Sequence, residues 1–363
     1  METISFARGI PAPELLPVSE LADCARAAIE RDGRTILNYG PAGGYAPLRG
    51  WIAERHGVDP DRVVLTNGSL QGLAFLAREL VSKGRVLVET PTYDRPLKLL
   101  AELGADVRGI PLDDEGLDVD ALAAELDAGA VSFLYTIPTF QNPTGRTLST
   151  ERRRRLVELA REHDLLVVED DPYGLVRFEG EPPPTLFELA GGEGVVYGSS
   201  FSKTIAPGAR VGYLVLPHRL AGAVTASATA TYITPSLVGE AAVYEFLRCG
   251  LLDPNLIRVR EALRERRDAM LAALERELGD AGRWSRPEGG YFLWLELADD
   301  VDARELLARA EAAGVTFVPG VDFGGPPNSL RLAFSFVDAG AVAEGVSRLA
   351  SLVPAAASVQ LAQ

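Results

Sequence analysis

Short runs of β-branched and leucine residues recur along this chain, each followed by polar or turn residues and then by a segment with helical periodicity. Uninterrupted apolar runs between helices are typical of strands that are buried on both faces of a parallel sheet. The sequence therefore predicts an α/β fold in which helices flank a mostly parallel sheet. The predicted strands lie at residues 63–65, 85–89, 131–136, 165–168 and 195–197.

Polar side chains follow the carboxyl end of every predicted strand. Ligands of open α/β sheets bind in the crevice beyond those ends. We therefore expect one crevice to collect side chains from segments that are far apart in the sequence. These residues are Ser69, Tyr93, Asn142, Asp170, Tyr173 and Lys203.

The last third of the chain predicts a second, smaller α/β domain. A chain of 363 residues is long enough for one large and one small domain. We assign residues 39–254 to the large domain, and residues 1–38 together with 255–363 to the small domain. In this part of the chain the predicted helices are 255–278 and 303–313, and the predicted strands are 291–296 and 330–334.

The composition argues against several classes of partner. A net charge of −15 leaves no excess of cations that could bind nucleic acid. No apolar run approaches the roughly 20 residues of a membrane helix, and the first residues lack the features of a secretory signal. We therefore expect a cytoplasmic protein that binds neither nucleic acid nor a membrane. We also expect no metal site, because the candidate ligands are scattered: His56, His163, His218, Cys24 and Cys249.

Lysine is rare in this chain, yet one lysine lies in a turn rich in serine. The 36 basic residues include only three lysines, and Lys203 is the one in that turn. A partly desolvated lysine amine can be neutral and nucleophilic. Ser200, Ser202 and Arg210 could bind a phosphate nearby, as could the backbone N–H groups of a helix that begins near Ser69. The alternative interpretation is a surface loop with an unrelated lysine and arginine.

A set of motifs occurs here in an order known from one enzyme family. The chain resembles the fold-type I, class I/II aminotransferases, especially the 2-aminoadipate/MocR-like branch, from about Phe6 to near the C-terminus. The resemblance implies a pyridoxal 5′-phosphate (PLP) enzyme with an aspartate aminotransferase-like large domain, built on a mostly parallel seven-stranded sheet, and a smaller α/β domain. The motifs, in chain order, are FARGIPAPELLP, YGPAGGYAPLRGWIAERHG, NPTG, VVEDDPYG, and SxSK followed by PGxR.

The resemblance implies catalytic roles for three residues. Lys203 would hold PLP as a Schiff base and then move a proton between the substrate α-carbon and the cofactor. Asp170, which the family pattern selects over its neighbour Asp171, would pair with the pyridinium nitrogen and let the ring accept electrons. Tyr93 would stack on the ring.

The remaining roles that the resemblance implies concern cofactor and substrate binding. Asn142 and Tyr173 would hydrogen-bond the phenolate oxygen of the cofactor. Arg331 would clamp the substrate carboxylate in a bidentate fork, supported by Asn142 and Gly9. The phosphate would be held by Ser69, the backbone N–H of Leu70, Ser200, Ser202, Arg210 and, across the interface of a homodimer with shared active sites, Tyr39.

Other interpretations of these residues remain open. Asp170 could cap a turn, Tyr93 and Tyr173 could be ordinary half-buried aromatics, and Arg331 could pair with a structural carboxylate. Asn142 and Pro143 could form only a turn, and Ser69 could be a helix N-cap as well as a ligand. Arg8 stands where the family usually has a small residue. It could reach the mouth of the substrate site and favour an acidic side chain, but we expect it to point to solvent.

The resemblance also leaves the reaction open. Transamination between an α-amino acid and a 2-oxo acid is the leading function. The same site could serve a lyase, a cyclase or an oxidase, because the fold does not decide which bond at the α-carbon breaks. A sensor that binds PLP and an amino acid without catalysis is a further alternative. No DNA-binding segment precedes the enzyme-like region, so we do not expect a MocR-type regulator.

Overall fold

The computed structural model describes residues 3–353 and contains one large and two small sheets. The large sheet has eight strands in the order β2-β9-β8-β7-β6-β3-β4-β5. All neighbouring pairs between β8 and β4 are parallel, whereas β9 and β5 run antiparallel to their neighbours. The strands are β2 (Val63–Thr66), β3 (Arg85–Thr90), β4 (Val107–Asp113), β5 (Gly116–Leu117), β6 (Val131–Thr136), β7 (Val167–Asp170), β8 (Val195–Ser200) and β9 (Gly212–Val215).

The α/β fold with a mostly parallel sheet is confirmed, but the predicted strand number of seven is wrong. The eighth strand is the two-residue β5, which folds back on β4 at the edge of the sheet. Gly116 begins this strand with φ of +96°, a conformation that glycine adopts without steric cost. A hairpin this short carries no periodic signal in the sequence.

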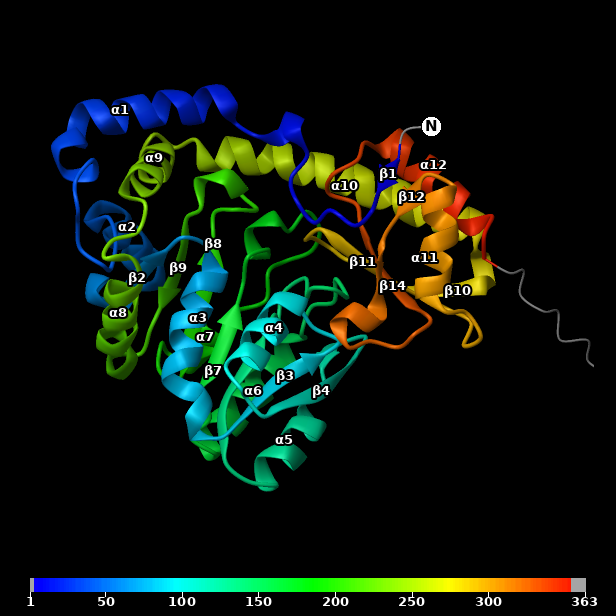
Figure 1. Cartoon of the computed structure of the whole chain (residues 1–363), viewed down its shortest axis with the longest axis horizontal. Coiled ribbons are helices and arrows are strands. Elements are labelled where there is room, and N and C mark those ends of the chain that lie inside the picture. The colour runs from blue at the N-terminus through cyan, green and yellow to red at the C-terminus, as the bar shows by residue number, and fades with distance from the viewer. Residues whose placement is uncertain (1–2, 354–363) are drawn as a thin grey trace, which may run out of the picture.

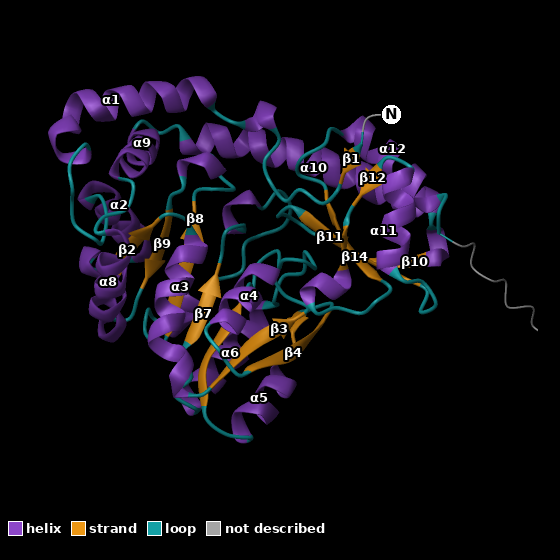
Figure 2. Cartoon of the chain, viewed as in Figure 1, coloured by secondary structure: helices purple, strands orange, loops and turns teal. Residues whose placement is uncertain are grey.

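Helices cover both faces of the large sheet (Figure 1, Figure 2). Alternate residues of a strand point to opposite faces, so Val63 and Leu65 of β2 join one hydrophobic cluster and Val64 joins another. The first face is covered by α2 (Ala46–His56), α5 (Val119–Asp127), α6 (Thr150–Glu162) and α7 (Leu186–Ala190), and the second by α3 (Ser69–Leu80), α4 (Asp94–Glu102) and α8 (His218–Tyr232).

Local sequence explains where several of these helices begin. The side chain of Asp118 accepts hydrogen bonds from the first N–H groups of α5, and Ser149 does the same for α6. Thr185 and Glu188 form a reciprocal capping box at the start of α7. These side chains satisfy N–H groups that have no partner within the helix.

The C-terminal part of the chain forms a four-stranded sheet with its own helices, to the right of the large sheet in Figure 1. The order β10-β11-β14-β13 is antiparallel throughout, and β1 pairs in parallel with β12 beside it. The predicted helices and strands of this region are confirmed. The elements of this region are β1 (Ile4–Ser5), α10 (Leu252–Glu277), β10 (Gly282–Trp284), β11 (Phe292–Leu297), α11 (Ala303–Ala312), β12 (Val315–Thr316), β13 (Val318–Pro319), β14 (Ser329–Ala333) and α12 (Ala339–Ala350). The helix before α10 in the chain, α9 (Leu237–Arg248), packs against α2 instead (Figure 1).

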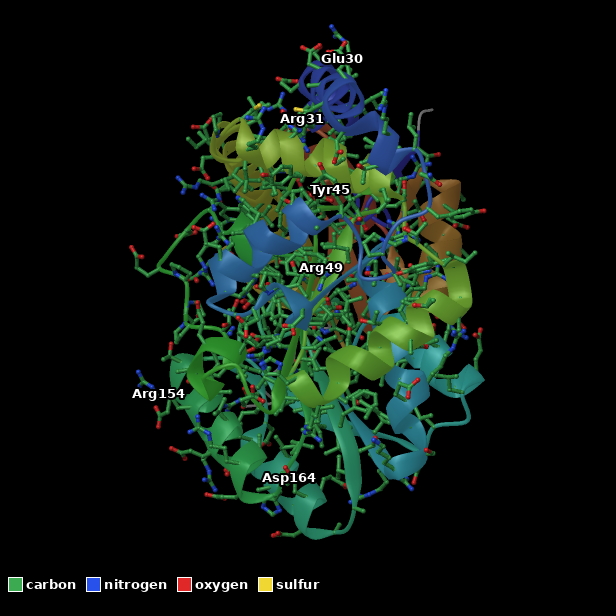
Figure 3. The ribbon with its side chains drawn as sticks, turned by 90° about the vertical axis from the view of Figure 1, so that its left-hand side faces the viewer. Glu30, Arg31, Tyr45, Arg49, Arg154 and Asp164 are labelled. Carbon is green, nitrogen blue, oxygen red and sulfur yellow. The ribbon has the colours of Figure 1, made fainter. Side chains whose placement is uncertain are left out.

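The N-terminal helix α1 (Val18–Ile36) lies along α9 and not on the small sheets (Figure 1). Arg31 of α1 forms an ion pair with Glu245 of α9, and the hydroxyl of Tyr45 donates to Asp32 over 3.0 Å. Figure 3 shows Arg31, Tyr45 and Arg49 on this face of the molecule. The division of the chain at residues 38 and 254 stays a prediction.

Among residues 3–353, no helix is long and apolar enough to cross a membrane. The predicted cytoplasmic location stays a prediction.

Candidate active site

A cavity of about 440 Å³ opens at the carboxyl ends of the central strands, where the large sheet meets the four-stranded sheet. Twelve of the thirteen residues predicted for the site line this cavity, and Tyr39 is the exception. They are Gly9, Ser69, Leu70, Tyr93, Asn142, Asp170, Tyr173, Ser200, Ser202, Lys203, Arg210 and Arg331.

The topology explains why distant segments meet here. Parallel strands end on the same edge of the sheet, so the residues that follow them share one crevice. Ser69 follows β2 and begins α3, while Asp170 and Ser200 are the last residues of β7 and β8. Arg331 reaches the same cavity from β14 of the small sheet.

The amine of Lys203 faces the N-terminal segment of the chain. Its Nζ donates a hydrogen bond of 2.6 Å to the carbonyl oxygen of Gly9 and lies 5.1 Å from the ring centroid of Tyr291. Burial, with smaller contributions from the charges of Arg331 and Arg210, lowers the pKa of Lys203 to about 8. A neutral, nucleophilic amine is therefore accessible close to neutral pH.

The carboxylate of Asp170 has one paired and one free oxygen. Oδ2 accepts a hydrogen bond of 2.7 Å from the Tyr135 hydroxyl, whereas Oδ1 is buried without a partner among residues 3–353. Burial raises the pKa of Asp170 to about 7. A cationic N–H in the cavity would give this free oxygen a partner and favour the charged carboxylate.

The neighbouring acid, Asp171, lies outside the cavity lining. Its carboxylate accepts hydrogen bonds from the Tyr197 hydroxyl over 2.9 Å and from the backbone N–H of Gly174 over 2.8 Å. Both of its oxygens are therefore already used within the fold. This difference supports the selection of Asp170 over Asp171.

The guanidinium of Arg331 is held by neutral groups. Nη1 donates to Oδ1 of Asn142 and Nη2 donates to the carbonyl oxygen of Ala7, each over 2.9 Å, while Nε has no partner among the described residues. The rings of Phe292 and Phe323 contact the guanidinium, with centroids 4.2 and 4.8 Å from Cζ. Burial lowers the pKa of Arg331 to about 10. Within residues 3–353 no carboxylate forms an ion pair with Arg331, so its guanidinium can bind the carboxylate of a ligand.

Glycine residues allow close packing where the cavity meets the start of α3. Gly68 precedes α3 with φ of +98°, and a Cβ there would lie 2.3 Å from Nη2 of Arg210. A Cβ on Gly212 would lie 2.4 Å from the backbone nitrogen of Ser69. The start of α3, with its free N–H groups, and Arg210 therefore approach closely enough to bind one anion.

Tyr39, the exception among the predicted site residues, and Arg8 both lie away from the cavity. Tyr39 is 76% exposed and borders a separate hollow with Leu37 and residues 234–238. Arg8 is exposed, and its guanidinium stacks on the ring of Phe336 at 5.0 Å, outside the cavity lining.

Sequence reasoning missed several residues of the site. Tyr135 lies inside β6, and its contact with Asp170 depends on the register of β6 and β7. Phe292 comes from β11, whose apolar pattern indicates only a strand. Asp94 and Arg95 also line the cavity at the start of α4. The position of Asp94 and Arg95 directly after Tyr93 was the one signal that could have found them.

Comparisons with known proteins agree over almost the whole chain. The model of the family "Aminotransferase class I and II" matches residues 14–349. A 2-aminoadipate transaminase of Thermus thermophilus is 42% identical over 354 residues, which are 95% of this chain and 89% of that protein.

Two solved structures support this likeness. The first is LysN, an α-aminoadipate aminotransferase from Thermus thermophilus in complex with N-(5′-phosphopyridoxyl)-L-leucine. It superposes with a TM-score of 0.92 at 39% identity, over 97% of this chain and 92% of that one. The second is a kynurenine aminotransferase from Pyrococcus horikoshii in complex with pyridoxamine phosphate. It has a TM-score of 0.93 at 35% identity, over 97% and 91% of the two chains.

The residues around the cavity fit PLP. The unpaired oxygen of Asp170 suits a protonated ring nitrogen, the amine of Lys203 suits an aldehyde, and the glycine-lined start of α3 suits a phosphate. The ring nitrogen, the aldehyde and the phosphate lie at different places on the cofactor, and the cavity offers a fitting group for each of them. The chain therefore belongs to the class I and II aminotransferases and is a PLP-dependent aminotransferase.

Proposed function

We propose that Lys203, Asp170 and Arg331 carry out the transamination of an α-amino acid with a 2-oxo acid. When bound, PLP supplies an aldehyde for the substrate amine and a ring that withdraws electrons from the α-carbon. The observation that carries the proposal is that three groups line one cavity: the half-buried amine of Lys203, the carboxylate of Asp170 and the guanidinium of Arg331. Within residues 3–353, one oxygen of this carboxylate has no hydrogen-bond partner and the guanidinium has no carboxylate partner.

Lys203 has two tasks in this proposal. Its amine would hold the aldehyde of the cofactor and, when free, would move a proton to or from the substrate α-carbon. The pKa of about 8 suits both tasks, because a general base works best when its pKa lies near the pH of the reaction. The carbonyl oxygen of Gly9 orients the amine.

Asp170 and the residues around it hold the ring. Oδ1 of Asp170 would pair with the ring nitrogen, while Tyr135 holds Oδ2 in place. Tyr93 would stack on the ring, and Asn142 and Tyr173 would donate hydrogen bonds to the phenolate oxygen. Ser69, the N–H of Leu70, Ser200, Ser202 and Arg210 would bind the phosphate.

Arg331 would bind the α-carboxylate of both substrates. The contact with Asn142 orients the guanidinium, and Gly9 leaves room for the aromatic ring beside it, because a Cβ on Gly9 would lie 2.4 Å from Cζ of Phe292. The donor class that we propose includes amino acids with long side chains, since relatives are named for 2-aminoadipate and kynurenine.

We also propose that the chain acts as a homodimer. Leu37, Tyr39 and Ile233 expose 67, 76 and 54% of their surface, which is unusual for apolar side chains that lie near one hollow. Tyr39 would reach the phosphate in the partner's cavity. Sedimentation would report a monomer if this is wrong. If it is right, a mixture of Lys203→Ala and Tyr39→Ala subunits should recover part of the activity that each variant lacks.

The experiment that tests the reaction follows a half-reaction in the absence of a 2-oxo acid. The purified, PLP-loaded protein is mixed with a panel of single amino acids, and the cofactor is then analysed. Accumulation of pyridoxamine phosphate together with the matching 2-oxo acid is the expected result. Release of ammonia with unchanged PLP would favour a lyase or an oxidase, and no change with any amino acid would favour a sensor.

A further inference from the structure

A buried carboxyl group and a buried amide lie directly behind the cavity wall. Glu89 is the fifth residue of β3 and is 2% exposed, and Gln141 precedes Asn142 and is 3% exposed. Neither residue lines the cavity. Glu89 accepts hydrogen bonds from the Thr136 hydroxyl and the backbone N–H of Ile137, and Nε2 of Gln141 donates to its Oε2 over 3.0 Å.

The side-chain amide of Gln141 forms every hydrogen bond that it can make. Nε2 also donates to the carbonyl oxygen of Pro91 over 2.8 Å. Oε1 accepts from the backbone N–H and the hydroxyl of Thr144 over 2.9 and 2.7 Å. Two donors and two acceptors are the full capacity of a carboxamide, so its orientation is determined.

These bonds connect two loops that carry residues of the site. Pro91 lies two residues before Tyr93, and Thr144 lies two residues after Asn142. Asn142 in turn accepts a hydrogen bond from Arg331. The pair Glu89–Gln141 therefore sets the distance between the Tyr93 loop and the Asn142 loop, and through Asn142 the direction of the Arg331 guanidinium.

We propose that Glu89 and Gln141 are positioning residues that hold the substrate clamp in register with the ring-stacking Tyr93. The inference rests on the proposed roles of Tyr93, Asn142 and Arg331. An apolar pair of the same size could fill the space but could not bridge the two loops. Burying a carboxyl group without a directly bonded cation is costly, and here three donors from the chain compensate it.

The test exchanges the hydrogen-bond donor and acceptor between residues 89 and 141. Gln141→Glu puts an oxygen where Nε2 faces two acceptors, and Glu89→Gln puts an N–H₂ group where the Gln141 amide already donates. Each single variant should raise the KM for the amino acid about tenfold or more, with a smaller change in kcat. The double variant Glu89→Gln/Gln141→Glu restores the bond between the two side chains but not the bond to Pro91, so it should recover part of the loss.

Two further measurements do not depend on turnover. In the cofactor-free protein, hydrogen exchange at the backbone amides of Ile137 and Thr144 should become faster in both single variants and slow again in the double variant. Thr144→Val keeps the shape of the side chain and removes the 2.7 Å bond from the hydroxyl to Gln141, together with the longer 3.3 Å bond that the hydroxyl accepts from the backbone N–H of Arg146. This variant should fold normally and raise the KM several-fold. It keeps the proposal testable if Gln141→Glu does not fold.

Asn328→Asp is the matched control. It also replaces an amide by a carboxylate and removes a bond of 2.6 Å to a backbone carbonyl, that of Leu297, but outside the cavity lining. It should lower the melting temperature without changing the KM. The proposal would be overturned if the variants at positions 89 and 141 lost stability to the same degree as Asn328→Asp, kept the KM of the wild type and showed no recovery in the double variant.

Asn142→Ala and Arg331→Ala separate this inference from the proposed function. If both raise the KM while the variants at positions 89 and 141 do not, only the positioning role is wrong. If neither raises the KM, the proposed clamp itself is wrong, and the positioning role fails with it.

Discussion

The hydroxyl of Tyr135 donates a 2.7 Å hydrogen bond to one oxygen of Asp170 and leaves the other oxygen free at the wall of the cavity. Tyr135 is fully buried in β6, next to β7 in the sheet, so the sheet itself orients the carboxylate. A residue that takes no part in the chemistry thus decides which Asp170 oxygen can meet a ligand.

Tyr135→Phe should therefore change the pH dependence of the enzyme. Burial raises the pKa of Asp170 and the Tyr135 hydrogen bond lowers it, so the loss of the hydroxyl should raise the pKa further. The acidic limb of the kcat/KM profile should move to higher pH. Tyr197→Phe, which removes the corresponding bond to Asp171, is the control, and an equal shift in both variants would contradict the assignment.

Asp170→Asn should bind PLP and turn over slowly. The amide cannot supply the negative charge that keeps the ring nitrogen protonated, and a charge-assisted hydrogen bond contributes about 1.5–3 kcal/mol. That range corresponds to a loss of roughly 10- to 150-fold in kcat. Steady-state kinetics at saturating substrate measure it, and a kcat close to that of the wild type would remove Asp170 from the mechanism.

Lys203→Ala should abolish the covalent link to the cofactor. The yellow colour of the lysine-bound cofactor should disappear, and turnover should fall by about 10²–10⁴-fold or more, the usual contribution of a positioned acid–base group. Lys98→Ala, an exposed lysine that pairs with Asp94, should keep both properties. A yellow Lys203→Ala protein would mean that another group binds the aldehyde.

Arg331→Ala should act on substrate binding more than on cofactor binding. The variant loses the guanidinium that we assign to the α-carboxylate, so the apparent Kd of the amino acid should rise about 10- to 100-fold, while PLP stays bound. Arg331→Lys keeps the positive charge but not the bidentate geometry of the guanidinium. Its apparent Kd for the amino acid should lie between those of the wild type and Arg331→Ala. Titration of the cofactor spectrum with an amino acid gives the Kd, and an unchanged value in Arg331→Ala would refute the clamp.

Glu240 should make the stability of the protein depend on pH. Its Oε2 accepts the backbone N–H of Tyr45 over 2.7 Å, Oε1 has no partner within residues 3–353, and burial raises its pKa from the ordinary 4.5 to about 8. The fold therefore favours the protonated acid. This contribution is complete below pH 4.5 and is lost as the pH rises through 8.

Glu240→Gln should flatten that dependence by a few kcal/mol between pH 4.5 and 8, as urea unfolding at several pH values would show. Glu245 should affect the pH dependence of stability in the opposite direction. Hydrogen bonds from Arg248 and Arg31 lower the pKa of Glu245, so Glu245→Gln should lose stability at neutral pH and approach the wild type as the pH falls. Parallel pH curves for wild type and Glu240→Gln would show that residue 240 does not titrate in this range.

The main strands could be predicted because they are buried on both faces. Residues 63–65 and 195–197 are continuous apolar runs, and residues 131–136 are mainly apolar, with Ser132 inside the run and Thr136 at its end. Each of these segments coincides with a strand of the large sheet. β4 was missed, because Arg108 and Gly109 are exposed near the edge of the sheet and interrupt the pattern. β9 was also missed, although it has four residues, as many as β2, which was predicted.

What the sequence determined by itself is the type of fold and the set of groups that can meet, since polar residues at the ends of parallel strands reach one edge whatever the details of packing. The order of the motifs along the chain also indicated the aminotransferase family. Only the tertiary structure decided how the groups act on one another. The free oxygen of Asp170, the Gln141 amide between two loops and the exposure of Tyr39 depend on strand register and burial, which join residues far apart in the chain and leave no local pattern in it.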